Sequence, residues 1–123
     1  MSKRVLDVGN CAMDHSMIKR FLTGHFGCEV IQADAADDAL AALRQRQVDL
    51  VLVNRKLDVD YSDGVDVIRQ IKAEPQFAGV PVMLVTNYPE HQQLAVQLGA
   101  QRGFGKLELE QPATIERLRP ILS

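Results

Sequence analysis

Residues 48–57, with the sequence VDLVLVNRKL, constrain the fold more than any other part of this chain. Residues 50–53 are apolar at every position instead of at alternate positions, which is typical of a strand buried on both faces in the middle of a parallel sheet. The apolar run ends at the polar residue Asn54. Loops at the carboxyl ends of central strands carry function in open α/β sheets, so Asn54 is the first candidate for a functional residue.

The rest of the chain alternates between strand-like and helix-like segments. Strands are predicted at residues 5–8, 28–32, 50–53, 80–86 and 102–105. Each is followed by a segment with apolar residues at helical spacing, as in Met17, Ile18, Phe21 and Leu22. The βα unit thus occurs five times. We predict one α/β domain over residues 1–123, a doubly wound parallel (βα)5 sheet with right-handed crossovers.

Composition narrows the class of protein. The chain is 46% hydrophobic and 24% charged, with a formal net charge of −2 and scattered basic residues, so we expect neither nucleic acid nor a membrane as a partner. Cys11 and Cys28 form no CxxC pair, and the N-terminus shows no secretory signal. We therefore expect a reducing, cytoplasmic setting.

Four features carry a resemblance to a known family. They are the strand VDLVLV with its polar end, Ser62-Asp63-Gly64-Val65, the strand VPVMLVT at residues 80–86, and Gly99-Ala100 with Lys106 seven residues after Gly99. Because of the order and spacing of these four features, the chain resembles a response-regulator receiver domain along essentially its whole length. The receiver domain is the phospho-accepting module of two-component signalling. The resemblance implies a flavodoxin-like fold with strand order 2-1-3-4-5.

The chemistry of that family is missing from the corresponding positions. The resemblance places the phospho-accepting carboxylate at Asn54 and the acidic pair that holds magnesium at Gly9 and Asn10. A neutral amide is a poor nucleophile and a poor ligand for a hard dication. We therefore expect a degenerate pseudo-receiver that is not phosphorylated on aspartate, is not an enzyme, has no cofactor, and binds magnesium weakly or not at all.

Thr86 and Lys106 stand where the family uses a hydroxyl and an ammonium to hold the phosphoryl group. Because Leu107 follows Lys106 where the family usually has proline, we expect Lys106 to point to water. The position of the family's switch aromatic is Gly103, and Phe104 is expected to face the other side of its strand.

Several polar residues have other interpretations. Asp7 interrupts the first predicted strand. If Asp7 is buried in that strand, it needs a lysine or arginine partner. If the strand is shorter, Asp7 lies near the loop and weak metal binding becomes possible.

The loop at residues 57–64 is two residues longer than is usual in the family, and we expect a solvated turn there. It lacks the closing Glu of a calcium loop, because Arg69 stands at that position. His15, His25 and His91 show no metal-ligand spacing and are expected at the surface or at helix ends.

The first hypothesis is therefore a signalling module that binds a histidine kinase or an output protein without phosphorylation. The family places this contact at residues 89–98, 102–105 and 112–122. The chain ends with that last helix, so we expect action through a separate partner or through a part of a longer native chain.

Two alternatives remain open. One is a small-molecule sensor in which Gly9, Asn10, Asn54 and Thr86 form a neutral polar cleft for an uncharged ligand or, with Lys106, for an anion. The other is a receiver phosphorylated at another acid, such as Asp58, which requires the loop to fold back across the strand ends.

Overall fold

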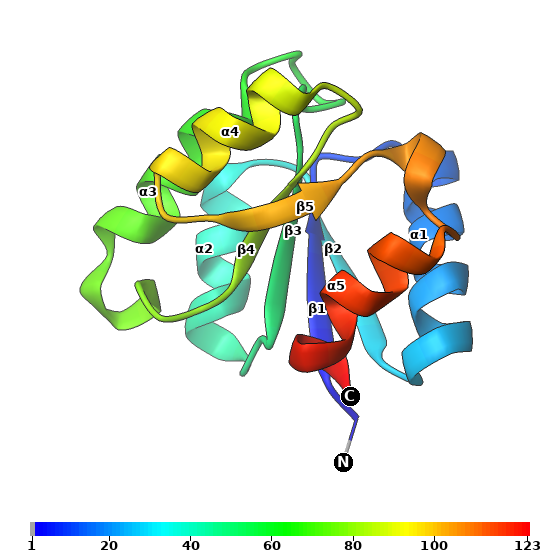
Figure 1. The fold of residues 1–123 in the computed structure, drawn as a ribbon. Coiled ribbons are helices and arrows are strands. Elements are labelled where there is room, and N and C mark those ends of the chain that lie inside the picture. The colour runs from blue at the N-terminus through cyan, green and yellow to red at the C-terminus, as the bar shows by residue number, and fades with distance from the viewer. Residues whose placement is uncertain (1) are drawn as a thin grey trace.

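The computed structural model describes residues 2–123. Its sheet has the order β2-β1-β3-β4-β5, and all neighbouring strands are parallel, which confirms the predicted fold class (Figure 1). The strands are β1 (Arg4–Val8), β2 (Glu29–Ala33), β3 (Leu50–Asn54), β4 (Val82–Val85) and β5 (Gln101–Phe104). The helices are α1 (Ala12–Phe26), α2 (Ala36–Gln45), α3 (Gly64–Ala73), α4 (Pro89–Gln97) and α5 (Pro112–Leu122), with short 3-10 helices η1 (Pro75–Phe77) and η2 (Lys106–Glu108).

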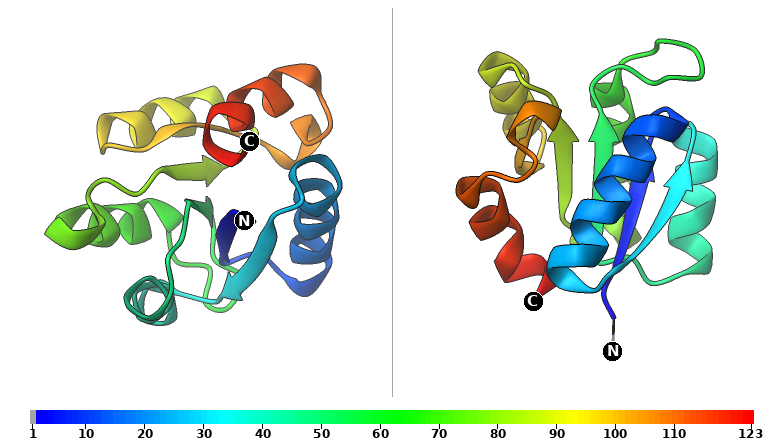
Figure 2. Two further views of the ribbon diagram at one scale, coloured as in Figure 1. Left: turned by 90° about the horizontal axis from the view of Figure 1, so that it is seen from below. Right: turned by 90° about the vertical axis from the view of Figure 1, so that its right-hand side faces the viewer.

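Helices cover both faces of the sheet. α1 and α5 lie on one face, and α2, α3 and α4 lie on the other (Figures 1 and 2). β3 is buried on both sides, as its uninterrupted apolar run predicts: Leu50 and Leu52 pack toward α1 and α5, whereas Val51 and Val53 pack toward α2 and α3. All four side chains are fully buried.

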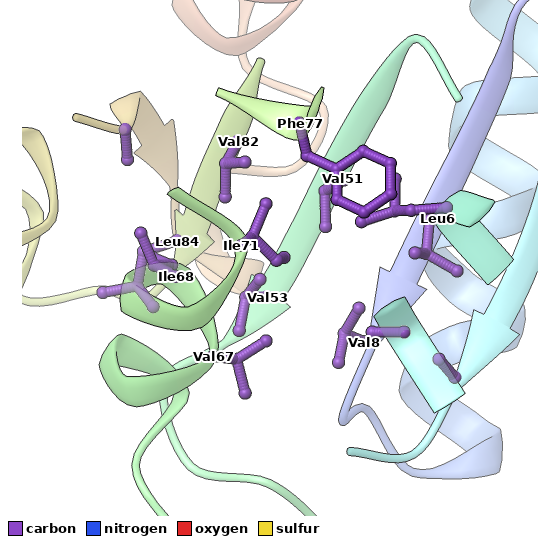
Figure 3. Close-up of a cluster of buried hydrophobic side chains, with 14 of the residues drawn as sticks. Leu6, Val8, Val51, Val53, Val67, Ile68, Ile71, Phe77, Val82 and Leu84 are labelled. Atoms are coloured by element: carbon purple, nitrogen blue, oxygen red, sulfur yellow. The ribbon is translucent and has the colours of Figure 1, made fainter. Parts of the chain in front are cut away.

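The two faces hold separate hydrophobic clusters. Figure 3 shows the one under α3, where Ile68 and Ile71 from the helix meet Val51 and Val53 from β3. Burying a side chain of this size stabilises the fold by roughly 1.5–3 kcal/mol. These clusters hold the strands in register, and so they fix the positions of the loops that follow the strands.

Two helices begin in different ways. The Asp63 side chain caps α3 by accepting a hydrogen bond from the Val65 amide at 2.9 Å. α1 begins at Ala12 after Cys11, so Asp14 lies in its first turn and is not its cap. Among the described residues 2–123, no helix has the length and apolarity needed to cross a bilayer.

Candidate functional site

Asn54 ends β3 and uses its amide group to join two loops. Its Nδ2 donates to the carbonyl oxygen of Lys56 at 2.7 Å and reaches that of Gly9 at 3.4 Å. Both donor hydrogens are thus directed at backbone acceptors. A carboxylate at this position would instead place its oxygens against two carbonyl oxygens, with no donor to offer.

Gly9, which the resemblance places at the first position of the family's acidic pair, lies under a side chain from the β3–α3 loop. Its φ is +83°, a conformation that favours glycine, and a β-carbon there would clash with Leu57 Cδ2. Leu57 is only 2% exposed, and the neighbouring Asp58 amide donates to the Gly9 carbonyl at 2.9 Å. The expectation of a merely solvated turn is therefore wrong for Leu57, although residues 58–62 are exposed.

Asn10, the second position of that pair, is buried and turns toward Asp7. Its Nδ2 donates to Asp7 Oδ1 at 2.6 Å, and His15 Nδ1 lies 2.7 Å from Asp7 Oδ2. Asp7 is fully buried inside β1, opposite Leu52, so the longer strand register is correct. The expected lysine or arginine partner is wrong, because a histidine and an amide take that role.

Burial raises the pKa of the Asp7 carboxyl, and the hydrogen bonds with His15 and Asn10 oppose this shift. His15 lies in the first turn of α1, at a helix end as expected, but its side chain is only 14% exposed. Asn10 Oδ1 is buried and has no partner among the described residues.

The residues at these positions do not fit a magnesium ion. Gly9 offers no side-chain oxygen, the Asn54 amide donates to carbonyl groups, and both Asp7 oxygens have close partners. Magnesium requires near-octahedral oxygen coordination with carboxylates. In the part of the chain that the structure describes, no three His, Cys, Asp or Glu side chains gather in a way that could hold a metal.

Lys106, in η2, points toward α1. Its Nζ lies 2.7 Å from Asp14 Oδ2, and this hydrogen bond holds the pKa of the Asp14 carboxyl below its usual value. The expectation that Lys106 points to water is therefore wrong.

Thr86 follows β4 and is held by the start of α4. Its Oγ1 accepts a hydrogen bond from the Tyr88 amide at 3.3 Å and lies 3.2 Å from His91 Nδ1. The Tyr88 and His91 rings meet edge to face, with centroids 5.4 Å apart. His91 thus belongs to the site instead of being an isolated helix-end residue.

A cavity of about 380 Å³ opens at the carboxyl ends of β3 and β4. It brings together three of the predicted site residues, Asn54, Thr86 and Lys106, but not Gly9 or Asn10. The sequence analysis missed the other polar residues of its lining, which are Arg55, Lys56, Asn87, Tyr88 and His91. Arg55, Lys56, Asn87 and Tyr88 lie between the regular elements, where no periodic pattern marks them, and His91 lies in the first turn of α4.

Gly103, at the switch-aromatic position, is bonded to α4. Its amide donates to Gln92 Oε1 at 2.8 Å, while Gln92 Nε2 donates to the Leu84 carbonyl at 2.9 Å and reaches that of Thr86 at 3.3 Å. A β-carbon at position 103 would clash with the Leu84 carbonyl oxygen. Phe104 faces the other side of the sheet, as expected, and is buried with α5.

Comparison with protein families places these features in context. The model of the response regulator receiver domain matches residues 11–115. The chain belongs to this family. Receiver domains interact with proteins such as kinases or output domains. The search of curated proteins found no match for this receiver domain.

Solved structures share the fold of this receiver domain. A putative response regulator from Chloroflexus aurantiacus is 20% identical with a TM-score of 0.85, over 99% of this chain and 98% of that one. Chemotaxis protein CheY4 of Vibrio cholerae is 22% identical, with a TM-score of 0.78 over 99% and 100% of the two chains. A signal receiver domain of a DNA-binding response regulator from Colwellia psychrerythraea is 23% identical, with a TM-score of 0.78 over 96% of each chain.

Proposed function

We propose that this receiver domain is a pseudo-receiver, a cytoplasmic protein-interaction module that acts without aspartyl phosphorylation and without enzymatic activity. The observation that carries the proposal is the Asn54 amide, which donates to the carbonyl groups of Lys56 and Gly9. A side chain without a nucleophilic oxygen stands at the acceptor position, and it takes part in the local structure instead of facing a phosphoryl donor.

The surroundings of Asn54 support the same conclusion. Leu57 fills the space beside Gly9 that an acidic side chain would need. The alternative acceptor Asp58 does not support phosphorylation either: its backbone reaches Gly9, but its side chain is exposed and does not line the cavity that holds Thr86 and Lys106.

The hydrogen bonds of Gln92 support a surface that is presented in one conformation. They join α4 to β4 and β5 at three backbone groups, and glycine at position 103 leaves no side chain there to move. We therefore propose that the surface of α4, β5 and α5 binds its partner constitutively. Val96 is 46% exposed on this surface, next to the exposed Arg102.

The proposed partner is a histidine kinase or a separate output protein. The test incubates the protein with each histidine kinase of the organism that encodes it, with and without radiolabelled ATP. We expect at least one kinase to bind with the same affinity in both states, and all of the label to stay on the kinase. Transfer of label to this receiver domain would overturn the proposal, and so would the absence of binding to any kinase or co-encoded output protein.

Two matched variants locate the contact. Val96→Asp places a charge on the α4 surface, and Val59→Asp makes the same change at an exposed valine of the β3–α3 loop. We expect Val96→Asp to weaken the complex about tenfold or more, because an unpaired charge at an interface costs more than 1.4 kcal/mol. Val59→Asp should leave the affinity unchanged, and equal effects would argue against this surface.

A further inference from the structure

The β3–α3 loop presents two exposed apolar side chains on a backbone that is held from inside. Val59 is 59% exposed and Tyr61 is 75% exposed. The buried Leu57 anchors the loop, because its amide donates to the Ser62 carbonyl at 2.9 Å and its carbonyl accepts from the Tyr61 amide at 2.7 Å. The two apolar side chains are therefore held in place at the surface, although burying them would stabilise the fold.

Tyr61 has the most unusual backbone conformation of this loop. Its φ is +60°, and it is the only non-glycine residue with a positive φ among residues 2–123. An L-residue is disfavoured in this left-handed region, whereas glycine adopts it freely. The turn therefore needs only a glycine at this position, and the tyrosine ring gains little burial in return. Residues that are held in such conformations are concentrated at binding and catalytic sites.

A groove of about 310 Å³ lies between this loop and the first turns of α2 and α3. Leu57 and Val67 contribute to its apolar lining, and no Lys, Arg or His lines it. Its charged lining residues are Asp37, Asp60, Asp63 and Asp66. All of its charged groups are thus negative, so the groove attracts a cationic group.

The four acids differ in how their charges are compensated. Asp63 and Asp66 each pair with an arginine, at 3.4 and 2.8 Å, and Asp63 also caps α3. Asp37 and Asp60 form no ion pair within residues 2–123. Asp60 directly precedes Tyr61 in the chain. Uncompensated negative charge therefore stands next to the exposed aromatic ring.

We propose that this loop and groove bind an extended, arginine-containing segment of a partner protein. A guanidinium group stacks on aromatic rings and donates parallel hydrogen bonds to carboxylates, so one arginine would contact the Tyr61 ring together with Asp60 or Asp37. Nucleic acids and anionic membranes are repelled by the same charges. Among the described residues, these acids do not gather in a way that could hold a metal ion.

This docking surface is separate from the surface of α4, β5 and α5. It uses the first turns of α2 and α3 and the loop before α3. We assign it to a second protein, and the assignment does not rest on the proposed function.

The test is an amide NMR titration with three capped hexapeptides, in which leucine alternates with arginine, lysine or glutamate. We expect the arginine peptide to shift the amide signals of Asp37, Asp60 and Tyr61 along one saturable curve. The lysine peptide should bind about threefold more weakly or worse, because an ammonium group offers no planar face and no fixed pair of donors. The glutamate peptide should give no saturable shift.

Absence of a saturable shift with the arginine peptide would overturn the proposal. Equal affinity for the lysine peptide would overturn the role of the Tyr61 ring.

Tyr61→Gly distinguishes a binding role of the ring from a structural one. Because glycine adopts the left-handed conformation freely, the midpoint of urea unfolding should be no lower than in the wild type. Binding of the arginine peptide should nevertheless weaken about fivefold or more, because the contact between the guanidinium and the ring is lost. Wild-type affinity in this variant would overturn the docking surface.

A pair of charge-matched variants separates a site from general attraction. Asp37→Asn removes an exposed carboxylate from the groove, and Glu116→Gln removes one from α5. We expect Asp37→Asn to weaken binding of the arginine peptide about threefold, as is typical for the loss of one exposed charge pair. Glu116→Gln should leave the affinity unchanged. Equal weakening by the two variants would show non-specific attraction and would overturn the site.

Discussion

Leu57 Cδ2 lies against Gly9 so closely that a β-carbon at position 9 would clash with it. This contact joins the β1–α1 loop to the β3–α3 loop at the place where a phosphorylated receiver needs an acidic side chain. In the proposed pseudo-receiver, the missing carboxylate and the occupied space have one structural basis: glycine permits the φ of +83° and also permits the buried leucine.

Gly9→Ala should therefore destabilise the protein by more than the conformational strain alone. Gly27 provides the control, because its φ is +64° but no atom lies within 4 Å of a β-carbon built there. We expect Gly27→Ala to lower the free energy of unfolding by about 1–2 kcal/mol, the usual cost of a left-handed non-glycine residue. Gly9→Ala should cost at least about 1 kcal/mol more, because the clash is added to the strain.

Urea denaturation measures both variants, and Leu57→Ala completes a double-mutant cycle. Leu57→Ala alone should cost about 2–5 kcal/mol as a buried leucine truncation. The double variant Gly9→Ala/Leu57→Ala should be more stable than the sum of the two single effects predicts, because the clash is absent from it. Strict additivity would mean that the two residues do not interact as described.

Gln92→Leu should loosen the junction between α4 and β5. The substitution removes the partners of the Gly103 amide and the Leu84 carbonyl, and two buried backbone groups without partners cost about 2–4 kcal/mol together. In a hydrogen-exchange measurement, the Gly103 amide should exchange faster in Gln92→Leu than in the wild type. Gln93→Leu, at the exposed neighbouring position, should leave that amide as protected as in the wild type. Unchanged protection in Gln92→Leu would contradict the role given to this glutamine.

Asp7→Asn should change the pH dependence of stability. Burial raises the pKa of Asp7 above its usual 3.8, against the hydrogen bonds of His15 and Asn10 and the charge of Lys106. The folded state therefore binds a proton that the unfolded state has already released, and stability from this group is lost as the pH rises from about 3.8 through the folded-state pKa.

The stability of Asp7→Asn relative to the wild type should thus increase over that pH range and become constant above it. Each unit by which the pKa of Asp7 is raised corresponds to about 1.4 kcal/mol of this increase. Urea denaturation at a series of pH values, with both proteins in the same buffers, gives the difference directly. A difference that falls with rising pH would show that the hydrogen bonds outweigh the burial.

Lys106→Met should raise the pKa of the Asp14 carboxyl toward its usual 3.8, because the hydrogen bond from Lys106 is the main cause of its low value. An NMR titration of the Asp14 side-chain carbon measures this pKa directly. Lys19→Met removes an exposed cation from the same helix and should leave the pKa of Asp14 nearly unchanged. If Lys106→Met also leaves it unchanged, the two side chains do not pair in solution.

The fold was predictable from the sequence because its signals are local. The uninterrupted run at residues 50–53 and the helical spacing of apolar residues give the order of the elements, and parallel strands then bring their carboxyl ends to one edge. The family resemblance, and not this local reasoning, assigned Thr86 and Lys106 to the same site as Asn54. The cavity is lined by all three, although Lys106 was expected to point to water.

The contacts around Gly9 and Asp7 were not predictable in the same way. Leu57 meets Gly9 across 48 positions of the chain, and Asp7 finds His15 only because α1 packs on β1. Tertiary contacts of this kind leave no periodic pattern. Two weaker signals were present. A glycine at a position where the family has an acid indicates that another part of the chain approaches closely. Gln92 lies three residues before the buried Ala95, which indicates that it also faces inward from α4.

The central claim is that this receiver domain does not accept a phosphoryl group, and intact mass spectrometry after incubation with acetyl phosphate and magnesium tests it most directly. The wild type and Asn54→Asp are measured side by side. We predict no phosphoryl adduct on either protein, because the variant restores a carboxylate but leaves Gly9 beneath Leu57 and Asn10 bonded to Asp7. An adduct on the variant alone would show that Asn54 by itself prevents the reaction. An adduct on the wild type would contradict the claim.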